Sequence, residues 1–236
     1  GNISREQSFT ADNAHFQQLD ISTHLNVRAE GIDTEKQTVR LSDGTEIGYD
    51  KLLLATGSSP LRPDIPGADQ PGVQPMWTIN HTQSALDIAS AVPAPRVVLV
   101  GAGFIGFIVL GAMFKRGWRL QVVERENQVL PRMLDSEAAA IVQHWLKSKE
   151  IPVHTGASVN SITAEGSNRL VQLSEGTTLP ADLVILATGV KANVQLAELG
   201  GITTDEGILV DQHMQTNVPN VFAAGDVAQG PVLFSD

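Results

Sequence analysis

Residues 41–57 of this chain, LSDGTEIGYDKLLLATG, return 132 positions later as residues 173–189, LSEGTTLPADLVILATG. Nine of the seventeen positions are identical, and Leu53 and Ile185 differ conservatively. Each copy reads as a hairpin turn followed by a short apolar strand that ends in Ala-Thr-Gly. Because turn, strand and terminus keep one register, the repeat predicts two related domains.

The second copy belongs to a unit that also carries the glycine fingerprint GAGFIG, which starts at Gly101, 88 residues before Gly189. The fingerprint follows an apolar strand predicted over residues 97–100 and opens a helix predicted over residues 105–116. The same offset from Gly57 falls before residue 1. We therefore expect one whole dinucleotide-binding domain and an incomplete second one.

Each fingerprint residue has a physical role in dinucleotide binding. Gly101 permits the tight turn, Gly103 lets the backbone approach a pyrophosphate, and Gly106 allows close packing of the helix. The N–H groups at the helix start attract the phosphates. Glu124, at the end of the next predicted strand, is placed to accept hydrogen bonds from a ribose 2′-hydroxyl and would repel a 2′-phosphate. This favours NADH over NADPH, although Arg125 beside it weakens the preference.

The Ala-Thr-Gly ends and the Gly225-Asp226 turn are further candidates for cofactor contact. Small residues at a strand end let the backbone pass close to a ligand, and open α/β sheets bind ligands at the carboxyl ends of their strands. Gly225 and Asp226 follow an apolar strand predicted over residues 221–224. Taken singly, each of these motifs could also be a plain turn.

Composition narrows the function classes. The chain has 236 residues, a formal net charge of −10 and no cysteine. The acidic balance argues against nucleic acid and anionic membranes as partners, and no apolar run approaches the length needed to span a bilayer. The lack of cysteine excludes disulfides and favours a cytoplasmic location. The six histidines show no metal-ligand spacing, so no metal site is predicted.

Other segments give weaker predictions. Residues 58–75 hold five prolines and read as a linker. Ser136 is expected to cap a helix that runs to about Lys149. The remaining expectations are a short helix over 12–19, short strands within 25–41 and 153–173, a helix over 83–91, strands over 119–124 and 182–187, Met113 and Phe114 in a helix core, and Ile141, Val142, Trp145 and Leu146 on one helix face.

Four stretches together resemble the flavoproteins of the pyridine nucleotide-disulfide oxidoreductase superfamily. They are YDKLLLATG (49–57), VVLVGAGFIG (97–106), DLVILATGVKAN (182–193) and TNVPNVFAAGD (216–226). Within the superfamily the chain is most similar to NADH-dependent ferredoxin or rubredoxin reductases, NADH oxidases and the flavin domain of NADH nitrite reductases.

The resemblance implies an α/β fold with two Rossmann-like domains of the glutathione-reductase type, each with a β-meander. An incomplete FAD domain, residues 1–77 and 191–236, would be split by an NAD(H) domain, residues 78–190. Ala55, Thr56, Gly57, Gly225 and Asp226 would lie against FAD, with Asp226 at the ribityl chain. The NADH site would include Gly101, Gly103, Ile105, Gly106, Glu124 and Gly189.

The implied activity is hydride transfer from NADH to FAD, with electrons passing on to a carrier protein such as ferredoxin or rubredoxin, to oxygen or to another centre. A homodimer of the full-length protein is also expected. Two residues depart from the family pattern: Ile108 stands where relatives carry a glutamate near the nicotinamide, and Trp77 stands where they often have a flavin-contacting arginine. These departures keep open an alternative, a non-catalytic dinucleotide-binding sensor or assembly module.

Overall fold

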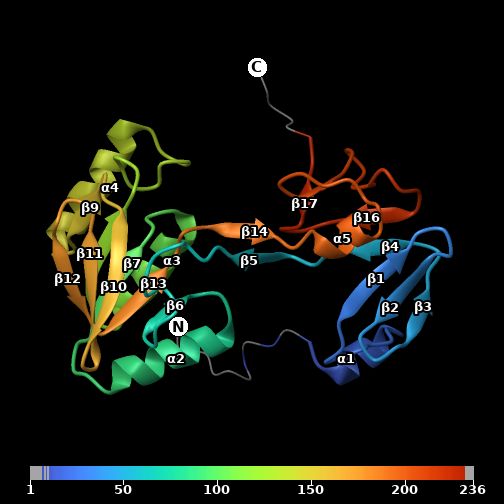
Figure 1. The fold of residues 1–236 in the computed structure, drawn as a ribbon, viewed down its shortest axis with the longest axis horizontal. Coiled ribbons are helices and arrows are strands. Elements are labelled where there is room, and N and C mark those ends of the chain that lie inside the picture. The colour runs from blue at the N-terminus through green and yellow to red at the C-terminus, as the bar shows by residue number, and fades with distance from the viewer. Residues whose placement is uncertain (1–6, 8, 10, 232–236) are drawn as a thin grey trace. The chain divides into compact units, whose positions relative to one another are not determined.

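The computed structural model, which describes residues 7, 9 and 11–231, divides into two compact units. The first contains residues 1–59 and 191–236, and the second contains residues 60–190. Figure 1 labels their helices and strands. The sequence boundary was expected after Trp77, whereas the structure divides after Ser59. Residues 60–77 join the second unit because β6 (Val73–Pro75) pairs with β13 (Leu183–Leu186) in its central sheet.

A five-stranded parallel sheet forms the centre of the second unit, in the order β6-β13-β7-β8-β9. Its other strands are β7 (Arg96–Val100), β8 (Arg119–Glu124) and β9 (Val153–Thr155). Continuous apolar runs in β7 and β13 are buried on both faces, as expected of strands within a parallel sheet. The sequence therefore predicted these strands to within one residue at either end.

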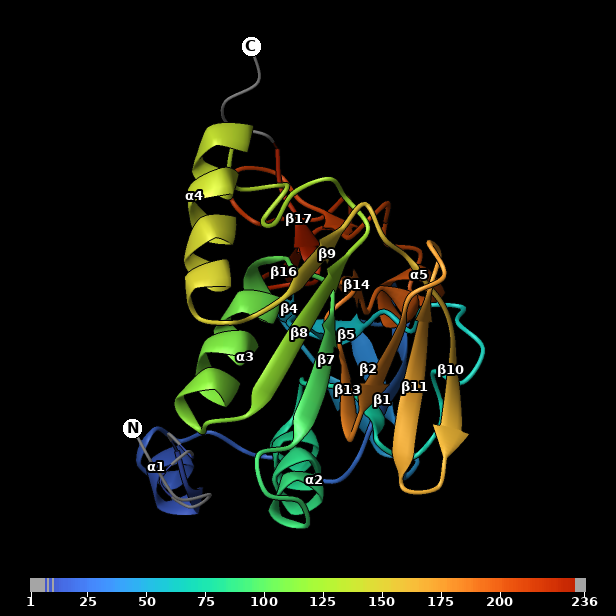
Figure 2. The same ribbon diagram turned by 90° about the vertical axis from the view of Figure 1, so that its left-hand side faces the viewer.

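Three helices cover one face of this sheet and a meander covers the other, as Figure 2 shows. The helices are α2 (Ile79–Ser90), α3 (Phe104–Lys115) and α4 (Ser136–Ser148). The meander consists of β10 (Val159–Glu165), β11 (Asn168–Leu173) and β12 (Thr178–Ala181), which are antiparallel. Leu99 and Leu146 lie in the cluster on the helix side, and Val98 and Val171 lie in the cluster on the meander side.

The first unit has a smaller core of its own, with Ile208 and Val221 fully buried. Its β-meander is β1 (Ala29–Asp33), β2 (Thr38–Leu41) and β3 (Glu46–Gly48). Parallel pairs join β4 (Leu52–Leu54) to β16 (Val221–Ala223) and β15 (Ile208–Leu209) to β17 (Ala228–Gln229). The helices are α1 (Asn13–Gln18) and α5 (Gln195–Leu199). Finally, β5 (Ser58–Pro60) pairs with β14 (Val190–Ala192).

The two repeat copies have the same backbone hydrogen bonds. In the hairpin turns, Leu41 N donates to Thr45 O and Leu173 N donates to Thr177 O, each at 2.8 Å. Gly44 and Gly176 have φ of +86° and +91°, a conformation that favours glycine. Both copies then continue into a parallel strand that ends in Ala-Thr-Gly. The duplicated sequence is therefore also a duplicated structure.

Several local expectations differ from the structure. The proline-rich stretch 58–75 contains β5 and β6 rather than a bare linker, since a proline without an N–H can stand at an edge strand. Helix α4 is capped by Asp135, which accepts from Ala138 N at 2.8 Å, and Ser136 is its first residue. Leu146 is fully buried, but Ile141 and Trp145 are 72% and 49% exposed. The single buried face that we expected is therefore wrong for these two residues.

Of the two residues expected in the core of α3, Met113 is buried and Phe114 is 38% exposed.

Helix α2 begins at Ile79, four residues before the predicted start, because Thr78 caps it. Among the described residues, no helix is both long and apolar enough to cross a bilayer.

Asp182, just before β13, forms hydrogen bonds with Arg96, the first residue of β7. Its Oδ2 accepts from Arg96 N at 2.7 Å and Arg96 Nε at 3.1 Å, and its Oδ1 accepts from Arg96 Nη2 at 2.7 Å. The Arg96 side chain hydrogen-bonds the carboxylate and so holds the pKa of Asp182 below its usual range. The interaction between Asp182 and Arg96 therefore stabilises the fold fully above the unfolded-state pKa of Asp182. This stabilisation is lost as pH falls through the lower folded-state pKa.

We predict that Asp182→Asn lowers the free energy of unfolding by about 2 kcal/mol at neutral pH, because an amide cannot reproduce the three charge-assisted bonds. The loss should shrink as pH falls below about 4, where Asp182 takes up a proton in the unfolded chain before it does so in the folded chain. Urea unfolding at pH 7 and pH 3 measures both values. An equal loss at the two pH values would contradict this assignment.

Residues 60–190 should fold alone, since both hydrophobic clusters of the second unit lie within them. A fragment of residues 78–190 would lack β6 and the buried Val73, and Ile162 N and Arg169 Nε would lose their acceptors, Pro66 O and Pro71 O. We expect its unfolding temperature to be lower by roughly 10 °C. Thermal unfolding followed by circular dichroism compares the two, and equal values would favour a boundary at residue 78.

Candidate dinucleotide-binding sites

The glycine turn in the second unit lies against the end of the second Ala-Thr-Gly strand. Gly101 has φ of +102°, and a Cβ built on it would lie 2.3 Å from Ala187 O. A Cβ on Gly106 would lie 2.4 Å from Gly101 O, so the close approach of α3 to the turn requires glycine or a shift of the helix. These contacts agree with the roles predicted for Gly101 and Gly106.

Gly103, the N-cap residue of α3, has a different environment. A Cβ on Gly103 would meet nothing within 4 Å, so the protein itself imposes no steric need for glycine there. No side chain caps the helix. The first N–H groups of α3 therefore have no side-chain acceptor, which is the arrangement that binds phosphate at a helix N-terminus.

Glu124 lies at the end of β8, directly beside the glycine turn. Only 8% of Glu124 is exposed. Its Oε2 accepts from Ala102 N at 2.7 Å, and its Oε1 accepts from Glu126 N at 2.9 Å. The neighbouring Arg125 points a mostly exposed side chain at Glu126, with Nη2 3.2 Å from Oε1. The acidic group is thus where the sequence predicted it, but its oxygens already have backbone partners.

Gly189 follows Ala187 at the end of the same strand. Its φ is +108°, and its carbonyl accepts from Leu61 N at 2.9 Å. Thr188 Oγ1 donates to Leu61 O at 3.1 Å. The structure therefore brings five predicted residues, Gly101, Gly103, Gly106, Glu124 and Gly189, to the carboxyl ends of three neighbouring strands. Ile105, in the first turn of α3, is 43% exposed.

In the first unit, the parallel pairing of β4 with β16 brings two predicted motifs to one edge. Ala224 N donates to Leu54 O at 3.1 Å, so Ala55 follows one strand end and Gly225 follows its neighbour. Gly57 and Gly225 have φ of +65° and +80°, and a Cβ on either would meet nothing within 4 Å. Both glycines therefore border open space.

Asp226 is held at this edge by Ser58, whose Oγ donates to Asp226 Oδ2 at 2.8 Å. Thr56 is held by Asn193: Thr56 Oγ1 donates to Asn193 O, and Asn193 Nδ2 donates to Thr56 O, both at 2.8 Å. Asn193 N also donates to Gly57 O at 2.9 Å. The predicted residues Ala55, Thr56, Gly57, Gly225 and Asp226 thus form one group.

Sequence reasoning gave no role to Ser58 or Asn193. Both lie next to predicted residues, since Ser58 follows Gly57 and Asn193 ends the stretch DLVILATGVKAN. Their partners are 168 and 137 positions away, which no local pattern indicates.

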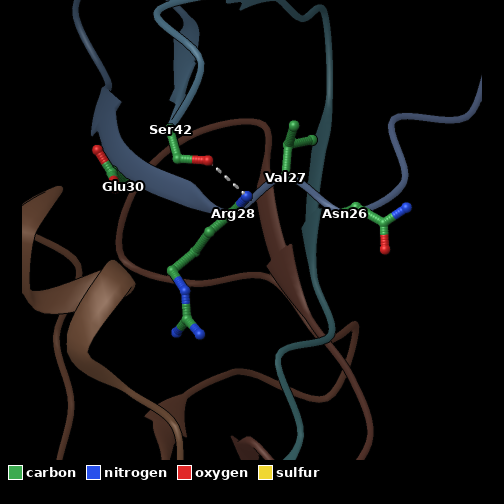
Figure 3. Close-up of a pocket in the computed structure, with 5 residues that line it drawn as sticks. All are labelled: Asn26, Val27, Arg28, Glu30 and Ser42. Atoms are coloured by element: carbon green, nitrogen blue, oxygen red, sulfur yellow. Dashed lines mark hydrogen bonds between the residues drawn. The ribbon is translucent and has the colours of Figure 1, made fainter.

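Figure 3 shows an open hollow elsewhere in the first unit, lined by Asn26, Val27, Arg28, Glu30 and Ser42. In it, Arg28 N donates to Ser42 Oγ at 3.0 Å. The second meander has the same bond, from Ser158 N to Ser174 Oγ at 3.1 Å. Since the bond belongs to the repeat, the hollow is a feature of the meander and not the predicted site. No group of acidic or histidine side chains suited to a metal occurs in the described part of the chain.

Comparison with known proteins agrees with this geometry. The pyridine nucleotide-disulphide oxidoreductase family matches residues 3–235. The nitric oxide reductase FlRd-NAD(+) reductase of Aeromonas salmonicida is 34% identical over 93% of this chain and 55% of its own length. Of known structures, a ferredoxin reductase from Rhodopseudomonas palustris has a TM-score of 0.88 at 32% identity, over 95% of this chain and 55% of that one.

An engineered water-forming NADPH oxidase, a variant of the NADH oxidase of Lactobacillus brevis, has a TM-score of 0.87 at 25% identity, over 96% of this chain and 51% of that one. The chain spans between a quarter and about half of the length of the curated relatives it matches. The α/β fold class with two Rossmann-like domains is confirmed by these likenesses. The chain belongs to the pyridine nucleotide-disulphide oxidoreductase family.

Proposed function

We propose that this chain is the nucleotide-binding part of an NADH-dependent FAD oxidoreductase. The observation that carries the proposal is the pair of equivalent Ala-Thr-Gly strand ends, each near glycine with open space around it: Gly57 and Gly225 in the first unit and Gly103 in the second. In the second unit the uncapped start of α3 suits a diphosphate, and we assign NADH to it. In the first unit we assign FAD to the edge formed by Ala55, Thr56, Gly57, Gly225 and Asp226. The domain assignment of the two units follows from these sites.

When bound, the cofactors supply the chemistry, a hydride transfer from nicotinamide to the flavin ring. The residues of this chain would bind and orient them. Asp226, fixed by Ser58, offers a carboxylate oxygen to hydroxyl groups of a bound FAD. Ile105 and Ile108, 43% and 56% exposed, give the first turns of α3 an apolar surface that would exclude water from a neighbouring ring.

The preference for NADH is supported by the sequence spacing of an engineered relative. The engineered NADPH oxidase replaces a glycine by alanine and an aspartate 18 positions later also by alanine. The two residues after that aspartate become arginine and serine, and a proline 7 positions after the aspartate becomes arginine. Gly106, Glu124, Arg125, Glu126 and Pro131 repeat that spacing here. This chain keeps the acidic residue that the NADPH variant lost, and a second carboxylate, Glu126, engages Arg125.

The electron acceptor is proposed from the relatives. A reductase of FlRd and a ferredoxin reductase are among the proteins that this chain is similar to, which supports a carrier protein as the acceptor. Oxygen is the alternative that the likeness to NADH oxidases supports. A cytoplasmic location is proposed from the lack of cysteine in all 236 residues. The net charge of −10 supports the expectation that nucleic acid is not a partner.

The full-length protein, loaded with FAD, tests the activity. We expect anaerobic addition of NADH to bleach the visible flavin absorbance within seconds. Stopped-flow absorbance spectroscopy measures this. A flavin that stays oxidised while NADH binds would contradict the oxidoreductase and favour the non-catalytic binding module that Ile108 and Trp77 raised.

We predict that the 236-residue chain binds NADH at least about tenfold more tightly than NADPH, because two carboxylates would oppose a 2′-phosphate. Isothermal titration calorimetry at low salt, where charge effects are strongest, measures both affinities. Equal affinities would show that Arg125 compensates for Glu124.

Gly103→Val separates binding from folding. A Cβ added at Gly103 meets nothing within 4 Å, so we expect the unfolding temperature to stay within about 3 °C of the natural chain. NADH affinity should fall at least tenfold, because the phosphates can no longer approach. Gly111→Ala, on the same helix and also with free space, is the control and should bind NADH normally. Unchanged NADH binding by Gly103→Val would remove the phosphate site from this turn.

A further inference from the structure

Both oxygens of the Glu124 carboxylate have hydrogen-bond partners within the protein itself. Each oxygen accepts one backbone N–H, from Ala102 at 2.7 Å and from Glu126 at 2.9 Å, and 8% of the residue is exposed. An ionised carboxylate has about four lone-pair sites, so each oxygen keeps one for a ligand. The two observed bonds lead to the backbone on either side of the site and can hold that backbone in place.

Ala102 is the middle residue of the glycine turn, between Gly101 and Gly103, and it is fully buried. Its N–H donates to Glu124, and its carbonyl accepts from Leu130 N at 2.9 Å. The preceding residue, Gly101, donates its N–H to Val123 O at 2.8 Å. The turn is thus fixed to the end of β8 and to the loop after it.

The bond to Glu124 differs from the other two because it involves a charged acceptor. Hydrogen bonds to a charged group are about twice as strong as those between neutral groups. The acceptor of this bond is a side chain, so a single substitution of Glu124 can remove the bond. The backbone bonds of Leu130 and Gly101 would remain. Glu124 therefore adds a charge-assisted bond that helps to hold the turn from which Gly103 and the start of α3 follow.

We propose that Glu124 is a positioning residue for the phosphate-binding turn, so that most of its effect on nucleotide affinity acts through the diphosphate and not through the ribose 2′-hydroxyl. The inference rests on the proposed function, because it assumes that this turn binds a dinucleotide. It deepens that function by separating two roles that one carboxylate could have.

The first test needs no ligand. In the 236-residue chain, amide hydrogen exchange at Ala102 measures whether the turn is held. We expect exchange at this amide to be at least tenfold faster in Glu124→Gln than in the natural chain, because the amide group of glutamine cannot supply both acceptor oxygens. The matched control is Asp182→Asn, which alters another buried carboxylate at the opposite ends of the strands: it should speed exchange at Ala102 no more than at other core amides, whereas Glu124→Gln should speed exchange at Ala102 selectively. Unchanged protection in Glu124→Gln would overturn the proposal.

The second test uses two probes, adenosine 5′-diphosphate and 2′-deoxyadenosine 5′-diphosphate, measured by calorimetry. We expect Glu124→Gln to weaken both by about tenfold, with the ratio between the two probes unchanged within twofold. A loss that is seen with the ribose probe and absent with the deoxyribose probe would overturn the proposal and leave Glu124 as a ribose-reading residue. Asp182→Asn should bind both probes normally.

Glu124→Asp is a second variant in case the glutamine variant does not fold. It keeps the charge but withdraws the carboxylate by one methylene, so we expect the same pattern at smaller amplitude, and a loss confined to the ribose probe overturns the proposal here too. Failure of the natural chain to bind either probe would instead refute the proposed NADH site. The hydrogen-exchange result would then still decide whether Glu124 holds the turn.

Discussion

The contact between Gly101 and Ala187 is the constraint on which the second unit depends. The backbone of the glycine turn lies so close to the carbonyl of Ala187 that no side chain fits between them. This contact joins two sequence motifs that are far apart in the chain, the glycine fingerprint and the second Ala-Thr-Gly. It also sets where α3 begins, because Gly106 packs on Gly101 in turn. The proposed nucleotide site is therefore formed mainly by backbone packing, with few side chains involved.

The repeat shows how much of this architecture the sequence contains. Backbone hydrogen bonds of the two hairpins agree in partner and length although only nine of seventeen residues match. Main-chain bonds tolerate changes of side chain, so the register survives where the surroundings differ. Leu53 and Ile185 illustrate the difference: Leu53 is 59% exposed, and Ile185 is fully buried between β6 and β7.

Strands, helices and both groups of candidate site residues could be predicted because each rests on a local pattern, such as an apolar run or a glycine turn. What could not be predicted depends on distant partners. Strand β6 lies in a proline-rich stretch and exists because β13 offers it an edge. Ser58 and Asn193 owe their positions to residues more than a hundred positions away. Ile141 and Trp145 follow helical periodicity, but their side chains lie on the part of α4 that the rest of the unit leaves exposed.

Helix α3 follows its N-cap, Gly103, with no side chain to satisfy its first N–H groups. A bound diphosphate would take the place of the missing cap, so loading of the cofactor and stability of the helix are thermodynamically linked. The second unit should consequently resist heat and proteolysis better when nucleotide is abundant, and the cell's dinucleotide supply would influence how long the protein persists.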